Sequence, residues 1–323
     1  MAGFITDVRG LQVGHADDAQ ALTGCTVVLC REGAVVGVDV RGAAPGTRET
    51  DLCKPGTLVD RAHAVLLAGG SAFGLDAASG IMRFLWEHHI GLDVGVTTVP
   101  IVPGAVLFDL GLGDVAWPDA EMGYRACLHA GEREVTQGSV GAGVGATVGK
   151  LSGMSTATKS GIGTASLRVD DVTLGALVAV NAFGDVLLPD SHTIIAGARR
   201  AGTSEFLDTA TTLLETHPQT LSPGLNTTIG VVATDAALTS EQVNHLARCA
   251  HDGLARTIRP VHTMLDGDTM FALSTGVVAV DWRDSMLPLA VGTAEVVARA
   301  VVAAIVHATP AGGLPIGRGW SAS

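Results

Sequence analysis

Short apolar runs rich in β-branched residues recur along the chain and predict β-strands. They comprise residues 25–29, 35–40, 64–67, 174–180 and 229–234. Glycine, proline, aspartate or asparagine bounds each run, as is typical of strands that end in turns.

Apolar residues at helical spacing predict helices over residues 75–88, 204–216, 239–258 and 290–307. The third begins with a capping box, in which Gln242 follows Thr239 by three residues. The fourth is apolar almost all round, so we expect it to be buried between layers. Strands and helices alternate irregularly, which predicts a layered α/β or α+β sandwich. No internal repeat is evident, and we expect one domain over residues 1–323.

The composition fits a folded domain with a closely packed aliphatic core. Of 323 residues, 47% are hydrophobic and 16% are charged, which excludes intrinsic disorder as the dominant state. Glycine contributes 42 residues and aromatic residues only 4%. Glycine allows backbones to approach closely where the core lacks large side chains.

Charge and cysteine usage limit the possible partners. The net charge is −12 and no basic run offsets it, so we expect no nucleic-acid partner. Five cysteines without a C-x-x-C motif, and no recognisable signal peptide, indicate a cytoplasmic protein. The longest apolar stretch, residues 296–306, contains Arg299 and is too short to span a membrane, so we expect no membrane partner.

Two glycine-rich stretches allow alternative interpretations. Residues 141–146 (GAGVGA) match a loose dinucleotide-binding fingerprint, but no apolar helical pattern follows them, so a close-packed turn is favoured. Lys150 precedes Leu151 rather than serine or threonine, which excludes a P-loop. Around Ser71, residues 69–74 are similar to a nucleophile elbow, but Phe73 replaces its second glycine. We expect Ser71 to cap the following helix instead.

Titratable residues offer one candidate cluster. The eleven histidines form no H-E-x-x-H motif and no tight group with cysteine or aspartate, so we expect no metal. Asp266 and Asp268, two residues apart, place two carboxylates on one face of a strand. Such a pair raises one pKa or jointly holds an amine, although a solvated turn has the same pattern.

Asn226-Thr227 lies between a proline-containing linker, residues 216–225, and an apolar strand. One interpretation is a turn asparagine followed by β-forming residues. The other is a self-cleaving bond, in which the Thr227 hydroxyl attacks the preceding carbonyl. Hydrolysis of the resulting ester frees an N-terminal threonine that carries both a nucleophile and a base. The α-amine has a pKa of about 7.7–8.0, which suits a base at neutral pH.

Several stretches together resemble the DmpA/P1 peptidases, family S58, which include β-peptidyl aminopeptidases and nylon-oligomer hydrolases. They are residues 5–8 (ITDV), 13–15 (VGH), 41–49 (RGAAPGTRE), 67–75 (LAGGSAFGL), 99–103 (VPIVP), 138–146 (GSVGAGVGA), 226–228 (NTT) and 266–269 (DGDT). The resemblance implies an αββα sandwich that is similar to ornithine acetyltransferase and to the N-terminal-nucleophile hydrolases. It also implies self-cleavage into residues 1–226 and 227–323, and assembly as a homotetramer or larger homo-oligomer.

The resemblance also implies roles for individual residues. Thr227 resembles the nucleophile, and Asp266 and Asp268 resemble the acidic pair that orients its α-amine. Lys159 resembles the lysine near the nucleophile, and Asn181 resembles the oxyanion-binding amide. Some relatives have a tyrosine where this chain has Phe108, so that hydroxyl is missing here.

We therefore expect a self-processing amide hydrolase with an N-terminal threonine and without cofactor or metal. An aminopeptidase that acts on short peptides or β-peptide-like amides is the favoured form. Two alternatives remain: an acyltransferase of the ornithine acetyltransferase type, whose lysine- and glycine-rich cleavage signature is absent here, and a non-enzymatic nucleotide-binding module built on residues 141–146.

Overall fold

The computed structural model describes residues 3–216 and 226–318. The linker predicted over residues 216–225 lies, apart from Thr216, outside the described residues. The long strands are β1 (Gln12–Asp18), β2 (Thr23–Val40), β4 (Arg61–Ala68), β10 (Ile162–Val169), β11 (Val172–Asn181), β14 (Thr227–Ala236) and β16 (Thr269–Val278). The α-helices are α1 (Ala77–Glu87), α2 (Ala120–Leu128), α3 (Thr209–Glu215), α4 (Ser240–Thr257) and α5 (Trp282–Val306).

Short elements connect this frame. The short strands are β3 (Gly46–Arg48), β5 (Leu92–Asp93), β6 (Thr98–Val99), β7 (Gly104–Val106), β8 (Thr147–Val148), β9 (Thr158–Lys159), β12 (Asp185–Leu187), β13 (Ile194–Ala196) and β15 (Ile258–Arg259). Single 3₁₀ turns are η1 (Ile5–Asp7), η2 (Ser71–Asp76), η3 (Gly141–Gly143) and η4 (Met154–Thr156).

One long strand links two halves of a continuous sheet. The strand order is β10-β11-β14-β16-β2-β4-β7-β3, with β1 also paired to β2. The C-terminal half of β2 pairs with β16, whereas its N-terminal half pairs with β1 and β4. The two apolar runs predicted at 25–29 and 35–40 are therefore parts of a single strand of 18 residues.

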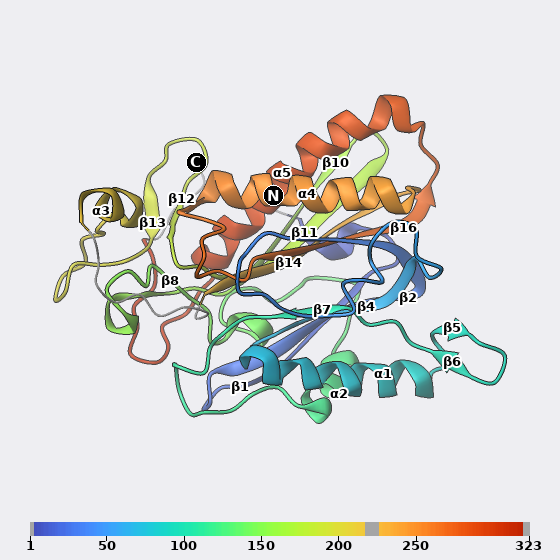
Figure 1. Ribbon diagram of the computed structural model, residues 1–323, viewed down its shortest axis with the longest axis horizontal. Coiled ribbons are helices and arrows are strands. Elements are labelled where there is room, and N and C mark those ends of the chain that lie inside the picture. Colours follow the sequence, from blue (N-terminus) through green and yellow to red (C-terminus); the bar gives the residue numbers. More distant parts are fainter. Residues whose placement is uncertain (1–2, 217–225, 319–323) are drawn as a thin grey trace.

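The sheet halves form the two inner layers of a four-layer sandwich (Figure 1). Alternate residues explain the layering, because Leu177 and Leu67 enter the core shared by the halves, whereas Val178 and Leu66 face outward. Helices α4 and α5 cover one outer face, and α1 and α2 cover the other. The predicted αββα sandwich is thus confirmed.

The helix predictions hold, but the starts of three helices need correction. Helix α3, predicted from residue 204, begins at Thr209. Helix α4 begins at Ser240 with the predicted capping box between Thr239 and Gln242. The helix predicted from residue 75 begins instead as the 3₁₀ turn η2. Ser71 makes no capping hydrogen bond there, so that prediction was wrong. The last helix begins at Trp282, eight positions before the predicted start, and continues through Pro288.

The length of α5 also corrects the argument about membrane spans. By length and composition, its residues 283–306 form a helix that is long and apolar enough to cross a membrane. In this fold α5 packs against β10, β11 and α4. Val296, Val297, Ala300 and Val301 are fully buried in that contact, as in a core helix.

Gly163 provides a test of the packing of α5 on the sheet. A methyl group on Gly163 of β10 would lie 2.2 Å from both the carbonyl oxygen of Ala300 and the amide nitrogen of Ala304. We expect Gly163→Ala to lower the free energy of unfolding by about 1–3 kcal/mol, as is usual for overpacking. Gly131→Ala is the matched control, since no atom lies within 4 Å of the added methyl group. Equal urea midpoints for the two variants would contradict this packing.

Candidate active site

The parallel pairing of β14 with β16 brings Thr227 next to the two aspartates. Ile229 pairs with Thr269, so the residues before these two strands also lie side by side. Asn226 forms a parallel bridge with Asp266, and the Gly267 N–H donates to the Asn226 carbonyl oxygen at 3.0 Å. The predicted nucleophile and the predicted acidic pair are therefore brought together.

Thr227 is almost fully buried within this contact, at 4% exposure. Its hydroxyl donates to the carbonyl oxygen of Asn226. A methyl group on Gly267 would lie 2.8 Å from the Thr227 Oγ1 and 2.5 Å from the Ala44 carbonyl oxygen. Glycine at position 267 is therefore what allows the nucleophile and the segment around Ala44 to approach this closely.

The two carboxylates are buried but well supplied with donors. Asp268 Oδ1 accepts the Thr228 N–H at 2.7 Å, and Asp268 Oδ2 accepts the His262 N–H at 3.1 Å. Asp266 accepts N–H groups of Phe183 at 3.2 Å and Thr263 at 3.0 Å, as well as the Thr263 hydroxyl.

The surroundings of Asp266 disfavour its ionised form. Burial raises the pKa of Asp266, and the neighbouring charge of Asp268 raises it further. A second negative charge nearby makes ionisation of a carboxyl group less favourable. Asp266 therefore holds a proton more readily than an isolated aspartate does.

Asn181 lies beside the predicted nucleophile on the other neighbouring strand. It is the last residue of β11 and pairs in register with Thr227. Its Oδ1 accepts the Thr147 N–H at 3.1 Å and a Lys150 N–H at 2.9 Å, whereas its Nδ2 donates to the Phe108 carbonyl at 3.0 Å. Because cationic Lys150 can only donate, the orientation of the Asn181 amide is fixed.

Lys150, rather than Lys159, contacts these residues. Lys159 is fully buried and donates to the carbonyl oxygens of Gly143, Ala146 and Ser160. Lys150 donates to both the side-chain and the main-chain oxygen of Asn181, and its charge also acts on Asp266. From the sequence, Lys150 drew attention only as a possible P-loop lysine. The signal that pointed to it was a single charge within the otherwise uncharged segment 144–151.

Both lysines are easily deprotonated, because burial lowers the pKa of each to about 7. Their neighbours differ. The charge of Asp266 partly opposes the effect of burial at Lys150, whereas that of Asp109 does so at Lys159. Only Lys150 is therefore linked electrostatically to the carboxylate pair.

The glycine-rich stretch has the geometry of a turn. Residues 141–143 form η3, and the short strand β8 follows, where a dinucleotide fingerprint requires a helix. Carbonyl oxygens of Gly143 and Ala146 bind Lys159. The stretch thus acts as a cage for a cation, which agrees with the predicted close-packed turn and removes the basis of the nucleotide-binding alternative.

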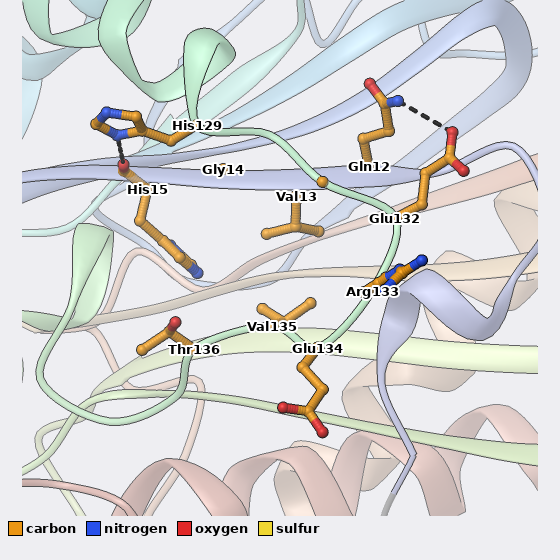
Figure 2. Close-up of a pocket in the computed structure, with 11 residues that line it drawn as sticks. Gln12, Val13, Gly14, His15, His129, Glu132, Arg133, Glu134, Val135 and Thr136 are labelled. Carbon is orange, nitrogen blue, oxygen red and sulfur yellow. Dashed lines mark hydrogen bonds between the residues drawn. The ribbon is translucent and has the colours of Figure 1, made fainter.

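A separate cavity of about 570 Å³ lies between β1 and residues 129–136 (Figure 2). His15, His129, Glu132, Arg133 and Glu134 are among its lining residues, and none of the Thr227 cluster is. In the part of the chain that the structure describes, no group of three histidine, cysteine or acidic side chains is arranged to hold a metal ion.

Comparisons with known proteins agree with this geometry. Residues 4–315 match peptidase family S58. An uncharacterized aminopeptidase of Mycobacterium tuberculosis is 46% identical, over 96% of this chain and 96% of its own length. A 6-aminohexanoate-oligomer endohydrolase of Agromyces is 32% identical, over 83% of this chain and 74% of its own length.

Solved structures support the fold. The L-aminopeptidase D-Ala-esterase/amidase of Ochrobactrum anthropi, described as a variant of the Ntn-hydrolase fold, superposes with a TM-score of 0.75. It is 21% identical, over 98% of this chain and 91% of that chain. A Burkholderia β-aminopeptidase superposes with a TM-score of 0.69 at 24% identity, over 98% of this chain and 91% of that chain. The protein is therefore a hydrolase of the aminopeptidase type, and it belongs to peptidase family S58.

Proposed function

We propose that the protein cleaves itself between Asn226 and Thr227 and then hydrolyses amides with the N-terminal threonine that is released. The contact between the Thr227 hydroxyl and the Asn226 carbonyl carries this proposal. The same carbonyl oxygen accepts the Gly267 N–H at 3.0 Å. These two contacts support the proposal, because they bring a hydroxyl and a backbone N–H to the same carbonyl group.

Self-cleavage begins when Thr227 Oγ1 attacks the carbonyl carbon of Asn226. The C–N bond breaks, the nitrogen of Thr227 takes up the hydroxyl proton, and an ester to Oγ1 forms. The Gly267 N–H stabilises the negative charge that develops on the carbonyl oxygen. Water then hydrolyses the ester, which leaves a carboxylate on Asn226 and a free α-amine on Thr227.

Hydrolysis of a substrate uses the same oxygen a second time. The Thr227 α-amine accepts the Oγ1 proton while Oγ1 attacks the amide carbonyl, and the amine product leaves with that proton. The Asn181 amide, oriented by Lys150, donates to the developing oxyanion. Asp268 Oδ1 accepts the Thr228 N–H, so it lies close to the α-amine that cleavage releases on the preceding Thr227. There it accepts a hydrogen bond from that amine. Water then releases the acyl group from Thr227.

The substrates proposed are short peptides or β-peptide-like amides. Relatives named aminopeptidase and 6-aminohexanoate-oligomer endohydrolase support an amide substrate. The Phe108 carbonyl accepts from Asn181, but the Phe108 side chain carries no hydroxyl, unlike the tyrosine implied for some relatives. A cytoplasmic homo-oligomer, a tetramer or larger, is part of the proposal.

Substitution of Thr227 tests the proposed cleavage. We expect the wild-type protein to yield a fragment that begins with Thr227, and Thr227→Ala to stay intact and inactive because it lacks the attacking oxygen. Thr228→Ala is the matched control, since Thr228 is the next residue and is also buried, at 0% exposure against 4% for Thr227. Denaturing electrophoresis with N-terminal sequencing provides the measurement. An intact wild-type chain, or a Thr227→Ala variant with full amidase activity, would refute the proposal.

The pH dependence of kcat distinguishes the roles of Lys150 and Lys159. Since burial lowers the pKa of Lys150 to about 7, we expect kcat to fall as the pH rises above 7 and the cation that orients Asn181 is lost. Lys150→Met should lower kcat about 10²–10³-fold, the usual cost of an oxyanion donor, and should abolish this alkaline decline. Lys159→Met should keep the decline, because Lys159 donates to backbone carbonyls away from Asn181. The reverse pattern in rate–pH profiles would assign the role to Lys159.

A further inference from the structure

His262, which was not among the predicted site residues, contacts the acidic pair. It lies between β15 and β16, and its ring Nδ1 is 2.8 Å from Asp268 Oδ2. Its backbone N–H donates to the same oxygen at 3.1 Å. One carboxylate oxygen is thus held twice by a single residue, while the other oxygen accepts the Thr228 N–H.

The backbone of His262 is adapted to this contact. Its φ is +54°, in the left-handed region that most side chains avoid. Such a conformation is unfavourable and persists where surrounding contacts impose it. In this case the conformation allows both the ring and the backbone of His262 to reach Asp268.

The surroundings of the His262 ring show which of its two nitrogen atoms carries a hydrogen. The Nδ1 atom faces a carboxylate oxygen and therefore carries a hydrogen, whereas Nε2 is buried without a hydrogen-bond partner. The ring packs edge-on against His251 of α4, with centroids 4.7 Å apart. Burial lowers the pKa of His251 to about 4, so His251 contributes no charge near neutral pH.

The charged group in contact with the His262 ring, among the described residues, is Asp268 of its own segment. Neutral His251 packs on the ring from α4, and Asp266 binds the neighbouring Thr263. Behind His251, Asp39 of β2 pairs with Arg41 at 2.8 Å. The N–H of His262 is therefore the donor that distinguishes one carboxylate of the pair from the other.

We propose that His262 is a positioning residue that keeps the negative charge of the acidic pair on Asp268 and aims Asp268 Oδ1 at the amino end of β14. Burial raises the pKa of Asp266, so Asp266 is the carboxyl group that takes up a proton in this arrangement. Environments that separate two carboxyl groups in this way assign them different roles in proton transfer. This inference rests on the proposed function, because the group that Asp268 orients is the α-amine released by cleavage.

Two isosteric substitutions separate positioning from structural support. His262→Asn keeps an N–H donor at the place of Nδ1, and His262→Asp replaces it with an acceptor of the same shape. Asparagine and aspartate both tolerate a positive φ. The pair therefore differs in the donor and charge presented to Asp268, and not in backbone strain.

We expect His262→Asn to retain kcat to within about threefold and His262→Asp to lose about 10- to 100-fold in kcat, the range for a hydrogen bond to a charged group. The acidic limb of the rate–pH profile should move to higher pH only in His262→Asp, because added negative charge favours protonation of the pair. Equal kcat values and equal limbs in the two variants would overturn the proposal, as would loss of activity in His262→Asn with normal urea unfolding.

Two further measurements keep the outcome decisive. If His262→Asp does not fold, His262→Gly, which accepts the same φ and lacks the ring, should show lower kcat with little change in KM; wild-type kcat in that variant would contradict a positioning role. Thr227→Ala is assayed in parallel. Activity that survives in Thr227→Ala refutes the proposed function itself. If activity is lost in Thr227→Ala but is unchanged in the His262 variants, only the role of His262 is refuted.

Discussion

The parallel pairing of β14 with β16 is the constraint on which the site depends. Parallel strands place their first residues at the same edge of a sheet, so Thr227 meets the Asp266-Gly267-Asp268 segment as soon as Ile229 pairs with Thr269. The antiparallel neighbour β11 ends at that edge and adds Asn181. The proposed nucleophile, acidic pair and amide donor thus come from three adjacent strands of one sheet.

The charged side chains at this edge of the sheet are buried, so they need many hydrogen bonds to the backbone. Carboxylates and ammonium groups away from water are costly unless each is hydrogen-bonded. Here backbone N–H groups bind Asp266 and Asp268, and backbone carbonyls bind Lys150 and Lys159. Glycines make these contacts possible, because a side chain at Gly267 or Gly42 would enter the space of the neighbouring backbone. The high glycine content therefore serves the site as well as the packing.

Patterns that are local in sequence predicted local structure well. The capping box at Thr239 placed the start of α4, and the apolar runs located the central strands. The start of α5 was not predicted, because a proline (Pro288) and charged residues near the first turn are more typical of a loop than of a helix. The four-layer arrangement was expected only through family resemblance. The periodicity of a strand shows which of its residues are buried, but not which helix or sheet packs on them.

By itself the sequence determined most central strands and the position of α4, and it singled out Asn226-Thr227 and the paired aspartates as candidates, since each of these depends on neighbours a few positions away. The tertiary structure decided which distant groups meet them. Lys150 rather than Lys159 contacts Asn181, and His262 turns through a positive φ to hold Asp268. Both outcomes depend on the direction of a side chain after the chain has folded, and sequence spacing carries no information about that direction.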